Sequence, residues 1–248
     1  MTFSRNVRII STLVLAIGWP FLIDAFGKAC IGENGAKGSG QVIDLPSDSL
    51  WLSIQRIDSV SYLGNDSLAK VCLERPDMKL RLFCALALLH MGGTPIREFS
   101  NSIPKVRSDF SKVQELERLI YEKASISKQL HLLNGVSFWT VFLDELVNAS
   151  EKGDVAALKE VLQFYPIANG DYAEDLDSHV LKILKASTQA VIKSSSVLNA
   201  YRLPIWQLIE QYPDDAEEIR NIYKEKCPKP LGACHDILNV LVNHRSGK

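Results

Sequence analysis

The stretch Asp154-Val-Ala-Ala-Leu-Lys-Glu-Val-Leu-Gln-Phe-Tyr165 decides the fold class, because its apolar residues recur at the spacing of an α-helix. One face holds five residues that are linked by separations of three and four: Ala157, Leu158, Val161, Leu162 and Tyr165. A helix this short carries a single apolar stripe and cannot bury it alone. The stretch therefore predicts a short helix that packs against neighbouring helices.

Most of the chain from residue 65 onward repeats this pattern of short apolar-faced segments separated by Pro, Gly, Asn and Ser. Helices are predicted from residue 67 to the proline at 76, from the Thr94-Pro95 pair onward, and over 78–91, 108–133, 138–147, 155–165, 172–186, 189–198, 204–212, 214–226 and 231–244. Only residues 50–57, where apolar positions partly alternate, are compatible with a strand. The predicted fold class is all-α.

Three runs resemble a HEAT-type or similar helical repeat: Gly153-Asp-Val-Ala-Ala-Leu-Lys-Glu-Val-Leu, Asp171-Tyr-Ala-Glu-Asp-Leu and Thr188-Gln-Ala-Val-Ile-Lys. They are also similar to exported helical proteins of bacteria whose function is uncharacterised. The resemblance covers about one fifth of the chain, implies stacked helical pairs, and brings no catalytic residues with it. The segments before residue 135 share no clear period with these runs. The prediction is a stack of short helices, either α-solenoid-like or an irregular helical bundle.

The N-terminus has the order of a secretory signal. Arg5 and Arg8 precede an uncharged apolar run over 9–23, which Pro20 interrupts. This run is shorter than the roughly 20 residues that span a bilayer. Gly27-Lys28-Ala29 places small residues where a signal peptidase reads, so cleavage is predicted after Ala29. An uncleaved signal anchor and a buried helix of a cytosolic protein are the alternatives.

Lipid attachment at Cys30 is a further alternative, because this cysteine follows the predicted cleavage site directly. Gly27 and Lys28 depart from the Leu-Ala-Gly-Cys pattern of lipoprotein signals. Residues 31–41 hold four glycines and are typical of a flexible linker. The predicted organisation is a signal peptide over 1–29, a linker over 30–41 and a single α-helical domain over 42–248.

Charge argues against a nucleic-acid partner. The chain has a formal net charge of −1, and residues 1–29 contribute +2, which leaves −3 after the predicted cleavage. Nucleic-acid binding needs clustered Lys and Arg to displace counterions from phosphates. The 46% apolar and 23% charged residues are ordinary for a protein with a hydrophobic core.

Five cysteines are present, and in an oxidising compartment cysteines are generally paired. Cys227-Pro-Lys-Pro-Leu-Gly-Ala-Cys234 is a short loop that can bring its two ends together, so a disulfide between Cys227 and Cys234 is predicted. Cys72 and Cys84 flank the junction of two predicted helices and form the second predicted pair. Four cysteines permit three pairings, and reduced core thiols at Cys72 and Cys84 are the alternative.

The sharpest polar cluster is Glu174-Asp175-Leu-Asp177-Ser-His179. Asp175 and His179 lie four residues apart on one helical face and, with Asp171, offer a set of metal ligands. The helix dipole favours acidic residues in any first turn, so the preferred interpretation is a solvated helix start. The run Asp214-Asp215-Ala-Glu217-Glu218 after Pro213 has the same explanation.

Catalytic motifs are missing from the sequence: it contains no His-Glu-x-x-His and no Gly-x-Ser-x-Gly. Trp139, Phe138 and Phe142 are interpreted as core residues rather than as a ligand platform. We expect no cofactor and no enzymatic activity. The predicted function is an exported, periplasmic or secreted protein-binding domain, either an immunity protein that occludes a toxin or an adaptor of the bacterial envelope. The alternative is a metal-dependent hydrolase of the envelope that uses Asp171, Asp175 and His179.

Overall fold

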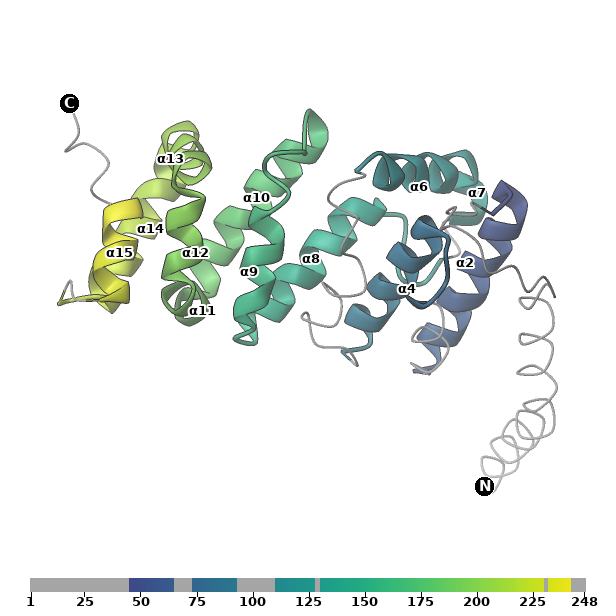
Figure 1. Ribbon diagram of the computed structural model, residues 1–248, viewed down its shortest axis with the longest axis horizontal. Helices are drawn as coiled ribbons and strands as arrows, with labels where there is room; N and C mark the ends of the chain where they lie inside the picture. The colour runs from purple at the N-terminus through teal and green to yellow at the C-terminus, as the bar shows by residue number, and fades with distance from the viewer. Residues whose placement is uncertain (1–44, 65–72, 93–109, 128–129, 230–231, 242–248) are drawn as a thin grey trace, which may run out of the picture. The chain divides into compact units, whose positions relative to one another are not determined.

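The computed structural model describes residues 45–64, 73–92, 110–127, 130–229 and 232–241 (Figure 1). All of these residues belong to the compact unit Val42–Lys248. Every regular element within these ranges is an α-helix, and the helices are short and stacked on one another. The predicted all-α class is therefore confirmed. Within the same ranges, no helix is both long and apolar enough to cross a membrane.

The N-terminal helices form a group around one buried helix. The group comprises α2 (Ser47–Tyr62), α4 (Met78–His90), α6 (Ser111–Glu122) and α7 (Ala124–Ser127). Helix α4 contacts both α2 and α6, and ten of its thirteen residues are buried. A helix that is apolar on all sides has to lie at the centre of its neighbours. Both α4 and α6 also contact α8 (Phe138–Glu151), which joins this group to the rest of the unit.

Three helical hairpins are stacked in the C-terminal half. They are α8 with α9 (Val155–Leu162), α10 (Asp171–Ala186) with α11 (Thr188–Lys193), and α14 (Pro213–Lys226) with α15 (Ala233–Leu241). The first helices contact one another in the order α8, α10, α14, and the second helices in the order α9, α11, α15. The short helices α12 (Ser195–Ala200) and α13 (Arg202–Gln211) are inserted before the last hairpin and pack against α15. This layout is solenoid-like, because each hairpin buries its apolar face against the next one.

Helix α14 ends the stack. Its buried residues Ala216, Ile219 and Tyr223 lie on one stripe, and most of its other residues are charged. The Tyr223 hydroxyl donates to the Leu184 carbonyl at 2.9 Å and so pairs one of the last carbonyl groups of α10. A polar outer face is what a terminal capping helix requires.

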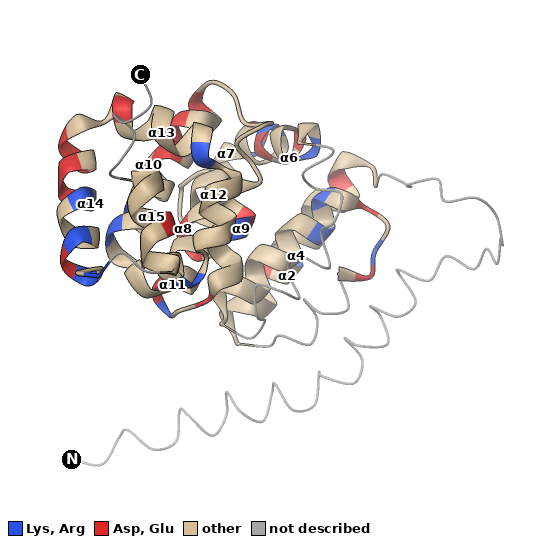
Figure 2. Ribbon diagram, turned by 60° about the vertical axis from the view of Figure 1, so that its left-hand side comes forward, with Lys and Arg blue, Asp and Glu red and all other residues tan. Residues whose placement is uncertain are grey.

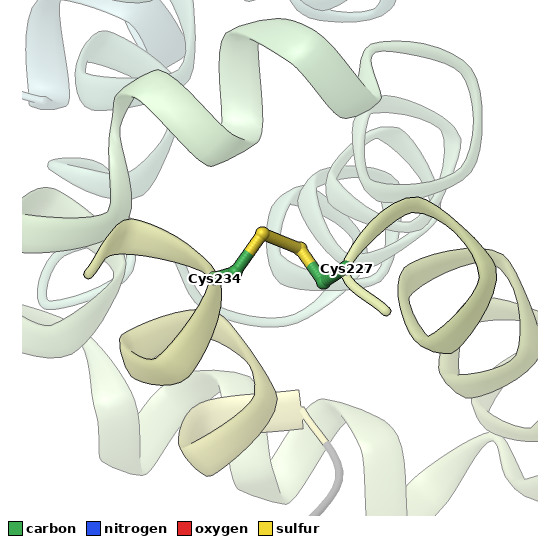
Figure 3. Close-up of a disulfide and its surroundings, with 2 residues drawn as sticks. All are labelled: Cys227 and Cys234. Atoms are coloured by element: carbon green, nitrogen blue, oxygen red, sulfur yellow. A yellow bond between two sulfur atoms is a disulfide. The ribbon is translucent and has the colours of Figure 1, made fainter. Parts of the chain in front are cut away.

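A disulfide closes the last hairpin, as Figure 3 shows. Cys227 follows α14 and Cys234 lies at the start of α15, with their Cα atoms 5.4 Å apart. This predicted pair is confirmed. Cys84 is fully buried in α4, whereas its predicted partner Cys72 lies outside the described residues, so that pairing stays a prediction. The terminal hairpin packs against α10 and α11 and against α12 and α13, and the disulfide adds a covalent link between its own two helices.

An aromatic cluster fills the space where α8 meets its neighbours. The Trp139 ring packs against the rings of Phe110, Phe142, Phe164 and Tyr172, with centroids 5.4, 5.7, 5.0 and 6.0 Å away. Trp139 is 2% exposed, and its indole N–H donates to the Tyr172 carbonyl at 3.2 Å. Trp139, Phe138 and Phe142 are therefore core residues, as predicted.

The segment predicted as one helix over 108–133 is divided, and a buried carboxylate binds the backbone near its C-terminal end. Helix α6 ends at Glu122 and α7 at Ser127, and residues 130–136 form a turn. Asp58 of α2 is 1% exposed, and its two oxygens accept the backbone N–H groups of His131 and Leu132 at 2.8 and 2.9 Å. The backbone here is thus paired with a distant side chain instead of with its own helix.

Two other segments differ from what the sequence indicated. Residues 50–57, which are compatible with a strand by sequence, are part of α2, because Leu50, Ile54 and Ile57 recur at helical spacing on its buried face. The helix predicted over 189–198 is two helices, α11 and α12, divided at the buried Ser194. The helix start predicted at residue 67 and the one predicted at Thr94-Pro95 lie outside the described residues.

The variant Asp58→Ala tests the importance of the buried carboxylate. We expect its free energy of unfolding to fall by about 2–4 kcal/mol, because two backbone N–H groups lose their acceptor. Urea denaturation followed by circular dichroism measures this loss. The control is Asp48→Ala on the same helix, where an exposed carboxylate lies 3.4 Å from Lys123 and should contribute less than about 1 kcal/mol. Equal losses in the two variants would contradict the assignment.

Candidate functional site

A shallow depression of about 240 Å³ lies beside α10, near the start of α14. Its lining combines polar, charged and apolar groups, namely Ser178, Leu181, Lys182, Lys185, Tyr212 and Asp215. Ser178 to Lys185 come from successive turns of α10, whereas Tyr212 and Asp215 come from the junction of α13 and α14. The depression is therefore positioned by the contact between two stacked hairpins.

Lys185 connects the two helices at this depression. Its ammonium group lies 2.5 Å from an Asp215 oxygen and 2.6 Å from a Glu218 oxygen. These two carboxylates raise the pKa of Lys185, since both stabilise its charged form. Lys182, on the next exposed position of α10, lies 3.6 Å from Asp144 of α8.

Carboxylates and tyrosines lie side by side at the edge of the depression. The Tyr165 hydroxyl donates to Asp177 at 3.1 Å. Burial raises the pKa of the Asp177 carboxyl, and burial followed by the charge of Asp177 raises the pKa of Tyr165. The pKa of Tyr212 is raised by desolvation and by the nearby carboxylates of Asp177, Glu174 and Asp215. The edge of the depression is thus acidic.

The segments that supply these carboxylates are unusually acidic for this chain. Residues 171–178 and 210–219 together contain nine Asp and Glu and no Lys or Arg. The other residues of 42–248 contain 24 Lys and Arg against 18 Asp and Glu, a net charge of +6. Figure 2 shows the acidic segments in red on α10 and α14. Negative charge is therefore concentrated on these two segments, beside a depression whose own lining includes Lys182 and Lys185.

The predicted solvated helix start is only partly correct. Asp171 and Glu174 are exposed in the first turn of α10, as the dipole argument predicts. His179, however, is 3% exposed and points toward α8. Its Nδ1 lies 2.6 Å from the Asp175 carbonyl oxygen and its Nε2 lies 3.1 Å from Asp144 Oδ1. The interpretation of His179 as a solvated residue was wrong, because the partner that buries it is on another helix.

The alternative metal set does not come together. The Asp175 carboxylate accepts from the Thr140 hydroxyl at 2.7 Å, Asp171 is exposed, and both His179 nitrogens face protein oxygens. Across the part of the chain that the structure describes, no three His, Cys, Asp or Glu side chains are grouped so that they could hold a metal ion. What the arrangement offers chemically is a surface of fixed negative charge, with hydroxyl groups beside it.

Glu117 of α6 is an important residue that the sequence did not indicate. Its carboxylate accepts the Trp139 backbone N–H at 2.5 Å, at the start of α8. Burial raises the pKa of Glu117, and its hydrogen bonds from Trp139, Phe138 and Ser137 only partly offset that effect. It thus pairs the unsatisfied N–H groups of another helix, 22 residues away. No local motif marks such a contact.

No known protein family, no curated protein and no solved structure matches this chain.

The raised pKa of Glu117 predicts a pH effect on stability. The folded state takes up a proton on Glu117 at higher pH than the unfolded state does, so this group favours folding most at acid pH. Its contribution falls as the pH rises through the folded pKa. The difference in free energy of unfolding between wild type and Glu117→Gln should therefore shrink as the pH is raised from about 4 to about 7.

Urea titrations at several pH values measure this difference. The control Glu122→Gln removes an exposed carboxylate from the same helix and keeps the change in chain charge equal. A difference between wild type and Glu117→Gln that grows with pH would contradict the assignment.

Proposed function

We propose that this protein is a binding module that acts by occupying the surface of another protein, and that this partner presents a basic surface. The observation that supports the proposal is the concentration of negative charge on α10 and α14, against a net charge of +6 on the remaining residues of 42–248. Complementary charge speeds encounter and disfavours wrong partners. A stack of helical hairpins also presents the extended surface that such proteins use.

Helix dipoles do not account for the whole acidic surface. The dipole favours acidic residues within the first turn only. Asp175 and Asp177 on α10, and Glu217 and Glu218 on α14, lie beyond the first turns of their helices. Glu174, Asp214 and Glu217 are also exposed and form no ion pair among the described residues. Their charge is thus available to a partner.

Two roles fit this binding module. One is an immunity protein that covers a basic surface of a toxin delivered to the cell envelope. The other is an adaptor or assembly factor of that envelope. A metal-dependent hydrolase is not proposed, because no feature of the described residues favours it over binding.

The test compares two variants with the same change in charge. Glu174→Gln, Asp214→Asn and Glu217→Gln together neutralise the acidic surface, and Glu74→Gln, Glu122→Gln and Glu151→Gln neutralise three exposed carboxylates outside α10 and α14. A partner captured from envelope extracts by the wild type should bind the surface variant about tenfold more weakly, since each exposed charge contributes up to about 1 kcal/mol. The control variant should bind as the wild type does, and affinity should fall with added salt. Equal binding of the two variants would refute the proposed surface.

Export is part of the same proposal and has its own test. The basic residues Arg5 and Arg8, the apolar run over 9–23 and the small residues before Cys30 support a cleaved signal. The intact mass of protein purified from its native envelope should correspond to a chain that begins at Cys30. A mass that includes Met1 through Ala29 would leave only the signal anchor or the cytosolic interpretation.

A further inference from the structure

We infer that His179 forms a pH-sensitive contact between α8 and α10, which is complete only while the imidazole ring carries both of its protons. The inference concerns a contact inside the hairpin stack and does not depend on the proposed function.

The ring is held from both sides. It is 3% exposed, with Nδ1 2.6 Å from the Asp175 backbone oxygen and Nε2 3.1 Å from Asp144 Oδ1. A backbone carbonyl oxygen can only accept a hydrogen bond, and so can an ionised carboxylate. Both ring nitrogens must therefore donate for the two hydrogen bonds to exist together. Only the imidazolium form has two N–H groups, whereas a neutral ring leaves one nitrogen lone pair facing an oxygen.

Charged groups on the neighbouring helices surround the contact between His179 and Asp144. From α8, Asp144 faces the ring directly, while the adjacent Glu145 pairs with His90 at 2.9 Å. On α10 itself, Lys182 lies 3.6 Å from the same Asp144 oxygen. The charges that α14 brings to α10, Asp215 and Glu218, are engaged by Lys185.

The titratable groups on the other neighbouring elements contact residues other than His179 or are exposed. Tyr165, which follows α9, donates to Asp177. Glu117 of α6 pairs with the start of α8, and on α11 the one charged residue, Lys193, is exposed. On α9 itself, Glu160 is buried and Lys159 is exposed. Asp144 supplies the carboxylate that contacts the ring, through Nε2.

Lys182 is a second partner for the Asp144 carboxylate once the His179 ring has lost a proton. Its side chain is about half exposed, at 49%, so it can turn without moving the core. Lys182 then takes the carboxylate, and the side-chain contact between α8 and α10 at His179 is lost. The contact should therefore be complete while the ring carries both protons and weaken once the ring has lost one of them.

The direct test is the protonation state of the ring in the intact protein. Nitrogen-15 NMR of the imidazole groups, from about pH 5 to about pH 9, should show both His179 nitrogens protonated at the acid end and one of them deprotonated at the alkaline end. A ring that is neutral across the whole range overturns the inference. A ring that remains doubly protonated at the alkaline end overturns it as well.

A matched pair of variants tests the stabilising contact. In Asp144→Asn the amide can donate to a neutral ring or accept from a charged one, so this variant should lose the pH dependence that the pair provides. Between about pH 5 and about pH 8 the unfolding equilibrium constant of the wild type should rise roughly tenfold relative to Asp144→Asn. Glu145→Gln is the control, since it disrupts a histidine–carboxylate pair on the same helix whose histidine, His90, is exposed.

A ratio between wild type and Asp144→Asn that does not change with pH would overturn the inference. So would a change of the same size in Glu145→Gln, because it would mean that any histidine pair on α8 has this effect. Should Asp144→Asn fail to fold, the NMR titration of the wild type decides alone.

Discussion

The fold depends on pairing the backbone N–H groups that are left unsatisfied wherever one short helix ends and another begins. Three buried or half-buried carboxylates do this at separate junctions. Asp58 binds the turn at 131–132, Asp77 binds the N–H groups of Leu80 and Leu45, and Glu117 binds the start of α8. Leaving such groups unpaired in the interior costs about as much as several ordinary hydrogen bonds contribute. These contacts therefore determine where the chain turns, in addition to stabilising it.

Helix α8 is positioned by one of these carboxylates, and it in turn positions the helices that pack on it. Glu117 fixes its first turn, the Trp139 cluster fills the space behind it, and α9 and α10 then pack on its other sides. The middle hairpin, α10 with α11, packs between the first hairpin and the last. In the last hairpin the apolar stripe of α14 is narrow, its outer face is charged, and a disulfide joins its two helices. The stack thus begins on a packed core and ends on a polar, cross-linked pair.

The sequence predicted the parts of this structure that depend on local spacing. Most helices over 138–226, apart from the division of 189–198 into α11 and α12, follow from periods of three and four residues. The pair Cys227–Cys234 follows from a seven-residue separation. It could not predict contacts whose partners are far apart. The turn at His131 and Leu132 is bound by Asp58, more than seventy positions earlier in the chain. His179 is buried against Asp144, which is 35 residues away in the sequence. The sequence shows only its spacing of four residues from Asp175, and that spacing was interpreted as a solvated helix start. The candidate site was likewise predictable only in part. The sequence shows its two acidic runs, but it does not show that carboxylates from both runs lie near Tyr212.

Helix α10 links the two features on which the proposals rest. One side of it faces α8 through Asp175 and His179, and the other meets α14 through Lys185 and the depression beside Tyr212. Asp175 and Asp177 are two residues apart, so a rigid helix cannot move one without the other. A weaker contact between His179 and Asp144 would leave α10 held to α8 by Thr140 and by apolar packing, while its contacts with α14 stayed in place.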